Sequence, residues 1–71
     1  MPELKALAKN VKQIRGDMRM SQLDFAAGCG ISTEILSLIE REKTNPKLST
    51  LQMIAAFTGQ EVSELLKIEH K

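Results

Sequence analysis

The spacing of apolar residues along the chain predicts five short helices. The first is expected over about residues 3–15, where apolar residues recur every three or four positions and so share one helical face. These residues are Leu4, Leu7, Val11 and Ile14. Pro2 suits the start of a helix, where a missing N–H is harmless, and Gly16 with Asp17 is expected to end it. No run alternates apolar and polar residues as a half-buried strand would.

Two further helices are predicted on either side of a glycine turn. Ser21 heads a helix over about residues 21–28, with an acid three positions later that resembles a capping box. Gly30 lies where the chain must turn, and Ser32 is the expected N-cap of a helix over about residues 33–41. The residues expected to face inward are Phe25, Ala26 and Cys29 in the first of these helices and Ile35, Leu36 and Ile39 in the second.

The last two helices are predicted over about residues 50–57 and 62–68. A turn signal, Asn45–Pro46, precedes them, and Ser49 with Gln52 forms a second capping-box pattern. The residues expected to face inward are Leu51, Ile54, Ala55, Val62, Leu65 and Leu66.

The third helix has an outer face that differs from its apolar face. At 100° per residue this outer face carries Thr33, Glu34, Ser37 and Arg41, with Leu38 and Glu40 on its two flanks. Two helices joined at a steep angle let the second project from the domain, and the major groove of DNA, about 12 Å wide, admits such a helix. A helix pair alone is a weak signal, because helical hairpins are common in all-α proteins.

Length and composition favour one small binding domain. The chain has 71 residues, 42% hydrophobic and 27% charged, so we expect a single domain over residues 1–71 with a core at about 4–68. A chain this short buries only about 60% of its unfolded surface, which disfavours a multi-step enzyme with a deep pocket. One cysteine allows no internal disulfide, and no apolar run nears the roughly 20 residues that span a bilayer. We therefore expect a cytoplasmic protein without membrane contact.

Positive charge flanks the middle of the chain. The net charge is only +1, which by itself favours nucleic acid weakly. No lysine or arginine occurs in residues 20–40. The basic residues on either side of this gap are Lys5, Lys9, Lys12, Arg15 and Arg19, and then Arg41, Lys43 and Lys47. If the chain binds DNA, the flanks must hold the phosphates.

Residues for catalysis or cofactor binding are scarce. His70 is the only histidine and is expected to be a solvated tail residue. Cys29 stands at an apolar-periodic position with no histidine nearby, which favours a small core residue over a reactive thiol. The sequence has no glycine-rich phosphate loop and no metal-ligand spacing. We expect no enzyme, no cofactor, no metal and no small-molecule ligand.

A set of residues in a fixed order and spacing adds a more specific signal. In chain order these are Val11-x-x-Ile14-Arg15, Ser21-Gln22, Phe25-Ala26, Gly30-Ile31-Ser32, Ser37-x-Ile39-Glu40, Asn45-Pro46, Leu48-x-x-Leu51, Ala55, Gly59 and Leu65-Leu66. Between about Val11 and Leu66 the chain thus resembles the phage-repressor/Cro-like (XRE-type) helix-turn-helix family. The resemblance implies a compact, all-α, five-helix bundle of the lambda-repressor-like DNA-binding type, with the helix-turn-helix at the second and third helices.

The resemblance also implies roles for particular residues. The positions that match DNA contacts or their supports are Gln22, Ser32, Thr33, Glu34, Ser37, Leu38, Arg41, Lys43, Thr44 and Asn45. Arg15 and Glu40 match a pair that usually joins the first helix to the third. The chain departs from the family where Glu42 replaces a usual glycine and Thr58 a usual leucine. Its reading face carries Glu34 and no base-reading arginine, glutamine, asparagine or lysine.

Two hypotheses for function follow. The first is a regulator of transcription, a repressor, that inserts the helix over about Thr33–Arg41 into the major groove of a palindromic operator in double-stranded DNA. Family members usually act as dimers, and we expect homodimer contacts around Gln60, Val62, Leu66 and Ile68. The alternative is a protein-interaction module on the same fold, without specific DNA binding. Its candidate apolar patch consists of Leu23, Ile35 and Leu38.

Overall fold

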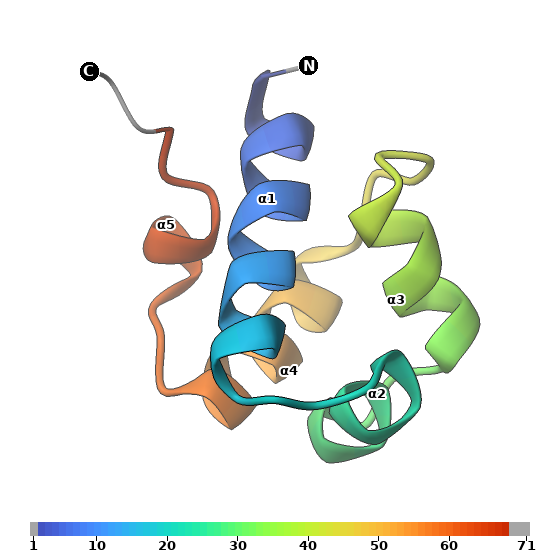
Figure 1. Cartoon of the computed structure of the whole chain (residues 1–71). Coiled ribbons are helices and arrows are strands. Elements are labelled where there is room, and N and C mark those ends of the chain that lie inside the picture. Colours follow the sequence, from blue (N-terminus) through green and yellow to red (C-terminus); the bar gives the residue numbers. More distant parts are fainter. Residues whose placement is uncertain (1, 69–71) are drawn as a thin grey trace.

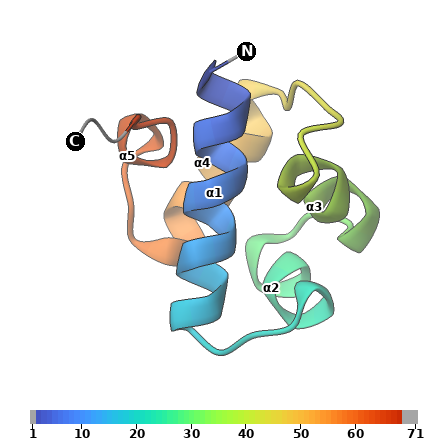
Figure 2. The same cartoon turned by 45° about the horizontal axis from the view of Figure 1, so that its top comes forward.

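The structure, a computed structural model, describes residues 2–68 and contains five helices in that range. They are α1 (Pro2–Asp17), α2 (Gln22–Cys29), α3 (Thr33–Glu40), α4 (Leu48–Thr58) and α5 (Val62–Leu65). Helix α1 runs through the middle of the bundle, with α3 and α5 on opposite sides of it and α4 behind (Figures 1 and 2). No strand occurs within residues 2–68, so the predicted all-α, five-helix fold is confirmed.

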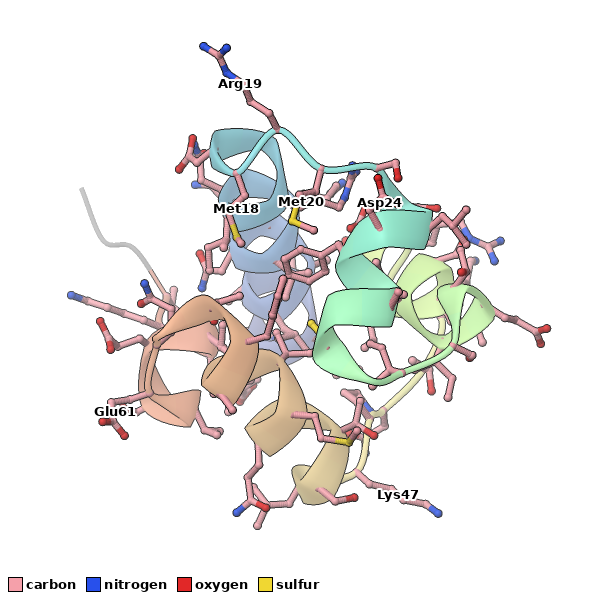
Figure 3. The ribbon with its side chains drawn as sticks, turned by 90° about the horizontal axis from the view of Figure 1, so that it is seen from below. Met18, Arg19, Met20, Asp24, Lys47 and Glu61 are labelled. Carbon is pink, nitrogen blue, oxygen red and sulfur yellow. The ribbon has the colours of Figure 1, made fainter. Side chains whose placement is uncertain are left out.

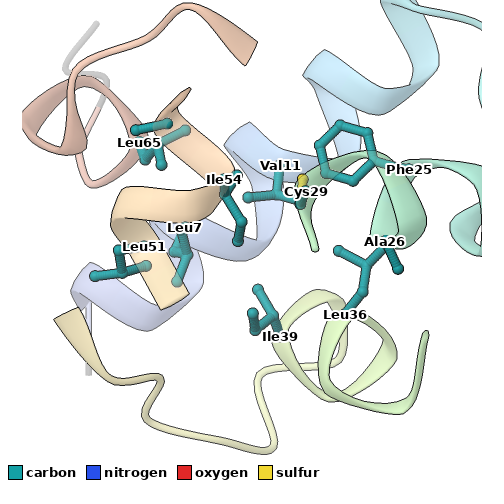
Figure 4. Packing of buried hydrophobic residues seen from close by; sticks show 11 residues of the cluster. Leu7, Val11, Phe25, Ala26, Cys29, Leu36, Ile39, Leu51, Ile54 and Leu65 are labelled. Atoms are coloured by element: carbon teal, nitrogen blue, oxygen red, sulfur yellow. The ribbon is translucent and has the colours of Figure 1, made fainter. Parts of the chain in front are cut away.

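The core is built from all five helices. Leu7, Leu36 and Ile54 are almost fully buried, as is Leu65 on the short α5. The rest of the buried cluster consists of Val11, Phe25, Ala26, Cys29, Ile39, Leu51 and Ala55, and Figure 4 shows how most of it converges. Because each helix contributes at least one apolar side chain, the helices support one another although four of them are short.

Side-chain caps fix the starts of α2 and α3 as the sequence predicted. Ser21 Oγ accepts a hydrogen bond from the Asp24 N–H at 3.1 Å, and Ser32 Oγ accepts one from the Ile35 N–H at 3.0 Å. Each satisfies an N–H that has no partner inside its helix. These caps set where each helix of the helix-turn-helix begins.

Helix α1 is longer than predicted. Gly16 and Asp17 belong to the helix, and the first positive φ comes only at Arg19, with φ 56. The Arg15 carbonyl accepts a hydrogen bond from the Met20 N–H at 3.2 Å, so the chain leaves the helix in a tight turn. The prediction that Gly16 ends α1 was wrong, because an exposed glycine near a helix end weakens the helix without breaking it.

Helices α4 and α5 also differ from their predicted bounds. Helix α4 has Lys47 as its N-cap, without a side-chain cap bond, so Ser49 lies inside the helix and the predicted cap there was wrong. Helix α5 ends at Leu65 instead of residue 68. Its start carries a cap that we did not predict, in which Glu64 Oε1 accepts from the Glu61 N–H at 2.9 Å. None of the helices within residues 2–68 is long and apolar enough to span a membrane.

Candidate nucleic-acid interface

The turn between α2 and α3 depends on Gly30. Its φ of 82° lies in the left-handed region, where a side chain would be strained. The N–H groups of Gly30 and Ile31 both donate to the Ala26 carbonyl, at 2.9 and 3.0 Å. This closed turn, together with the Ser32 cap, fixes how α3 leaves α2.

A buried carboxylate ties three elements together behind α3. Glu40, only 6% exposed, accepts from Arg15 Nε at 2.8 Å and from Arg15 Nη2 at 3.0 Å. Its Oε1 also accepts from Gln22 Nε2 at 3.1 Å. Arg15 Nη1 donates to the Met20 carbonyl at 3.0 Å, in the loop before α2. The hydrogen bond to Glu40 is the main cause that raises the pKa of Arg15, so the guanidinium stays charged.

Gln22 therefore has a structural role that the sequence did not reveal. We predicted a DNA contact for Gln22, which stays a prediction, and the structure also joins its amide to Glu40. The Gln22 side chain is half-buried at the first turn of α2. Its amide nitrogen carries two N–H donors, and the bond to Glu40 uses one of them. The structure brings Arg15, Glu40 and Gln22 into one network, which we call the Glu40 network.

The outer face of α3 presents a short row of side chains. Glu34 is exposed, whereas Thr33, Ser37 and Leu38 are half-buried. Arg41 Nε donates to the Ser37 carbonyl at 3.3 Å and to Ser37 Oγ at 3.2 Å. The serine thus orients the arginine, which leaves the far end of the guanidinium able to donate to other groups.

The loop after α3 begins with a residue in the left-handed region. Glu42 has φ 59, and the Lys43 N–H donates to the Leu38 carbonyl at 2.8 Å. The helix thus ends as it would with the usual glycine, although a glutamate stands there. Beyond it, Lys43 and Asn45 are exposed and Thr44 is half-buried.

Basic side chains project on two sides of the helix-turn-helix. Figure 3 shows Arg19 extending from the turn before α2 and Lys47 extending from the start of α4, at opposite edges of the molecule. Both are exposed. The middle of the chain, which has no lysine or arginine between residues 20 and 40, therefore lies between two basic edges, as the distribution of charge along the sequence suggested.

The candidate apolar patch is only partly exposed. Leu23 is 66% exposed and Leu38 is half-buried. Ile35, predicted to face the core, is 40% exposed, and it lines a shallow hollow with Thr44 and Pro46. That prediction was wrong because Leu36, Ile39 and Glu40 occupy the side of α3 that faces the bundle.

The candidate dimer residues also differ in how far they are exposed. Val62 and Leu66 pack against the core of their own chain, and Gln60 is half-buried. Ile68 is 39% exposed. The most exposed apolar residue near the end of the α3–α4 loop is one that we did not single out: Leu48, in the first turn of α4, is 61% exposed.

Cys29, the thiol considered for catalysis, is buried in the core. Burial raises the pKa of the Cys29 thiol to about 11, which makes it a poor nucleophile. Within residues 2–68 no three histidine, cysteine, aspartate or glutamate side chains gather as metal ligands would. His70 lies outside the described residues.

Comparisons with known proteins agree with this geometry. The sequence profile of the helix-turn-helix family matches residues 11–65. An immunity repressor protein of Bacillus phage phi105 is 33% identical over 60 residues, which cover 84% of this chain and 42% of that protein. The HTH-type transcriptional regulator DdrOP3 of Deinococcus deserti is 36% identical over 61 residues, covering 86% of this chain and 47% of the regulator.

Structural similarity points the same way. The crystal structure of the hypothetical transcription factor NHTF from Neisseria superposes with a TM-score of 0.86 at 31% identity, over 92% of this chain and 75% of that one. The chain spans less than half the length of the two sequence relatives. The family is shown by both sequence and structure, and the chain belongs to the helix-turn-helix family of the phage-repressor/Cro-like (XRE) type.

Proposed function

We propose that the chain is a DNA-binding regulator, a repressor, that inserts α3 into the major groove of a specific site in double-stranded DNA. The observation that carries this proposal is the placement of α3 itself. Its outer face is open, while the Glu40 network and the Ser32 cap hold its inner face and its start. A rigid helix with a free face suits base reading, because base contacts need side chains held in register with the groove.

Sequence preference would come from three side chains on α3. Glu34 can accept a hydrogen bond from cytosine N4, and Thr33 and Leu38 can contact thymine methyl groups. Glu34 also repels nearby phosphates, so α3 itself adds little affinity. A preference for cytosine and thymine on the strand that these residues face follows from this chemistry.

Affinity would come from the basic edges. Arg41, Lys43 and Lys47 are exposed and follow α3 along the chain, and Arg19 extends from the turn before α2 at the opposite edge from Lys47. The first N–H groups of α2 would bind a phosphate as well. Each phosphate neutralised contributes about −0.9 to the slope of log K against log salt. With so few basic groups we expect a shallow slope and modest affinity for one copy.

A homodimer on a palindromic site would compensate for modest affinity. Two copies of α3 would then reach half-sites about one helical turn apart. Of the expected contacts, Ile68 offers the most exposed apolar surface, and Leu48 adds more. Sedimentation with and without DNA tests this step; a monomer in both conditions, even at high concentration, contradicts it.

Selection of bound sites from random duplexes, followed by salt titration of the winner, tests the proposal. We expect an enriched palindrome. With Glu34→Gln, preference should change at one base pair while the other positions keep their bases. Glu61→Gln, at the N-cap of α5 and away from α3, is the matched control and should leave the selected site unchanged. No enrichment at low salt would refute DNA reading.

The exposure of Leu23 and Ile35 favours a second candidate, an interaction module that binds another protein. Substituting Leu23 with Gln separates the two functions. If the regulator proposal holds, the selected DNA site stays the same, because Leu23 is not among the proposed reading residues. The interaction module would be favoured by two results together. The wild type would select no DNA site, and it would associate with itself or with another protein in a way that Leu23→Gln abolishes.

A further inference from the structure

A shallow hollow follows the open face of α1, away from the residues that read DNA in the proposal above. Its volume is about 570 Å³. Ala8 and Gly16 keep its floor low because they carry little or no side chain. The lining consists of Lys5, Ala8, Lys9, Lys12, Gln13, Gly16 and Asp17 from α1, with Glu42 from the loop after α3.

Three lysines stand along this hollow at helical spacing. Lys5, Lys9 and Lys12 are exposed and follow at intervals of four and three residues, which puts them on one face of α1. Seven residues of helix extend about 10 Å. A row of this length that lies along the duplex axis would cover roughly three base-pair rises, at about 3.4 Å each.

Two acidic residues also line the hollow. Asp17 already accepts a hydrogen bond from Gln13 Nε2 at 3.3 Å. Glu42 lines the hollow from the loop after α3 and lies in sequence between the proposed phosphate contacts Arg41 and Lys43. The hollow is therefore continuous with the edge of the α3 surface at Glu42.

We propose that the lysine face of α1 holds a stretch of sugar–phosphate backbone beyond the bases that α3 reads, and that Glu42 weakens this contact. The inference rests on the proposed function and adds to it an extended footprint. Charge complementarity selects the occupant: a row of ammonium groups with a low floor fits a strand of phosphates. The contact supplies affinity and carries no base preference.

Removing positive charge from α1 and negative charge from Glu42 should change DNA affinity in opposite directions. Lys5→Gln with Lys12→Gln should weaken binding to the selected duplex at least tenfold and reduce the magnitude of the salt slope by about two, at about 0.9 per phosphate contact. Glu42→Gln should strengthen binding severalfold. Both variants should select the same base sequence as the wild type.

Lys67→Glu is the matched control, because it changes the net charge by the same two units on the α5 side of the molecule. It should weaken binding less than threefold with the slope unchanged. Thermal melting of each variant checks that it is folded. If the wild type selects a site but the double lysine variant binds it as well as the Lys67→Glu control does, this inference is overturned and the proposed function stands. A wild type that binds neither selected nor random duplexes overturns the proposed function as well.

Discussion

The aromatic ring of Phe57 lies directly against the backbone of Gly28. A Cβ placed on Gly28 would overlap Cζ of that ring and lie 2.9 Å from Cε2. The same ring meets Phe25 edge-on, with centroids 5.6 Å apart at 83°. Helix α2 can therefore approach α4 this closely only because position 28 has no side chain.

Gly28→Ala should destabilise the fold for this reason. The added methyl group displaces the Phe57 ring and disturbs its contact with Phe25, and overpacking of this kind costs about 1–3 kcal/mol. Alanine's better helix propensity, about 1 kcal/mol, offsets part of that loss. Urea denaturation should show a net loss of about 1 kcal/mol.

Gly16→Ala is the matched control for this change. Gly16 is also a helical glycine, but nothing lies within 4 Å of the position that its Cβ would take. The same substitution should therefore stabilise the protein by about 0.5–1 kcal/mol. If both variants gain stability equally, the close approach of Phe57 does not matter.

Asn10→Ala should release the end of α5. Asn10 Nδ2 donates to the Leu65 carbonyl at 2.8 Å and to the Lys67 carbonyl at 3.1 Å. Losing these bonds at the end of a four-residue helix should cost about 1–2 kcal/mol. In the variant, hydrogen exchange of backbone amides should accelerate more in α5 than in α1. Gln13→Ala, which removes an exposed amide bonded only to Asp17 on the same helix, should change stability by less than about 0.5 kcal/mol.

Local signals explain which parts of this fold the sequence could predict. The apolar face of α1 and the caps at Ser21 and Ser32 each depend on residues within about four positions, and these predictions agree with the structure. The start of α4 does not follow the same rule. Lys47 has no capping side chain, so its place at the helix start depends on packing of the helix and not on local preference.

Contacts between distant residues could not be predicted from spacing. The Asn10 bonds to Leu65 at the end of α5 and to Lys67 beyond it cross 55 and 57 positions, and the approach of Phe57 to Gly28 joins two helices. For the candidate site, the family resemblance proposed the pair of Arg15 and Glu40, which the structure brings together. The bond of the third member, Gln22, to Glu40 was not predicted, because nothing in the sequence marks the distance between these two residues.

Glu42→Gly should stabilise the protein. Glu42 is held at φ 59, a conformation that costs a residue with a Cβ about 1–2 kcal/mol. Glycine relieves that strain, but it also raises the conformational entropy of the unfolded chain, which offsets part of the gain. We therefore expect the free energy of unfolding to increase by about 0.5–1 kcal/mol. Thermal melting should rise by about 4 °C. Glu42→Ala removes the same charge but keeps a Cβ; a rise as large as glycine's would assign the effect to charge.

The Cys29 thiol should make stability depend on alkaline pH. Its pKa rises from 9.0 to about 11 through burial, so the folded state keeps its proton where the unfolded state has lost it. The stabilisation is complete below about pH 9 and is lost as pH rises through 11. Denaturation of the wild type and Cys29→Ala across this range should give curves that converge as pH rises, because other titrating groups are common to both. Parallel curves would contradict the assignment.

Removing one partner of the Glu40 network should cost more than removing both. Arg15→Met leaves a carboxylate that is 6% exposed with only the Gln22 amide as a side-chain donor. We expect a loss of about 3 kcal/mol, the lower end of the range for a buried pair, because Arg15 is itself partly exposed. Glu40→Leu alone strands the guanidinium less severely, since its Nη1 keeps the Met20 carbonyl.

The double variant Arg15→Met, Glu40→Leu replaces the pair with apolar side chains and should recover much of the loss. A double-mutant cycle by urea denaturation measures the coupling, which we expect at about 1–3 kcal/mol. Additive losses would show that the two residues stabilise the fold independently. DNA selection by the double variant adds a functional readout. If the network orients α3, the double variant should bind its site more weakly than the wild type even under conditions where both are fully folded. The reason is that these hydrogen bonds no longer hold α2 and α3 to α1.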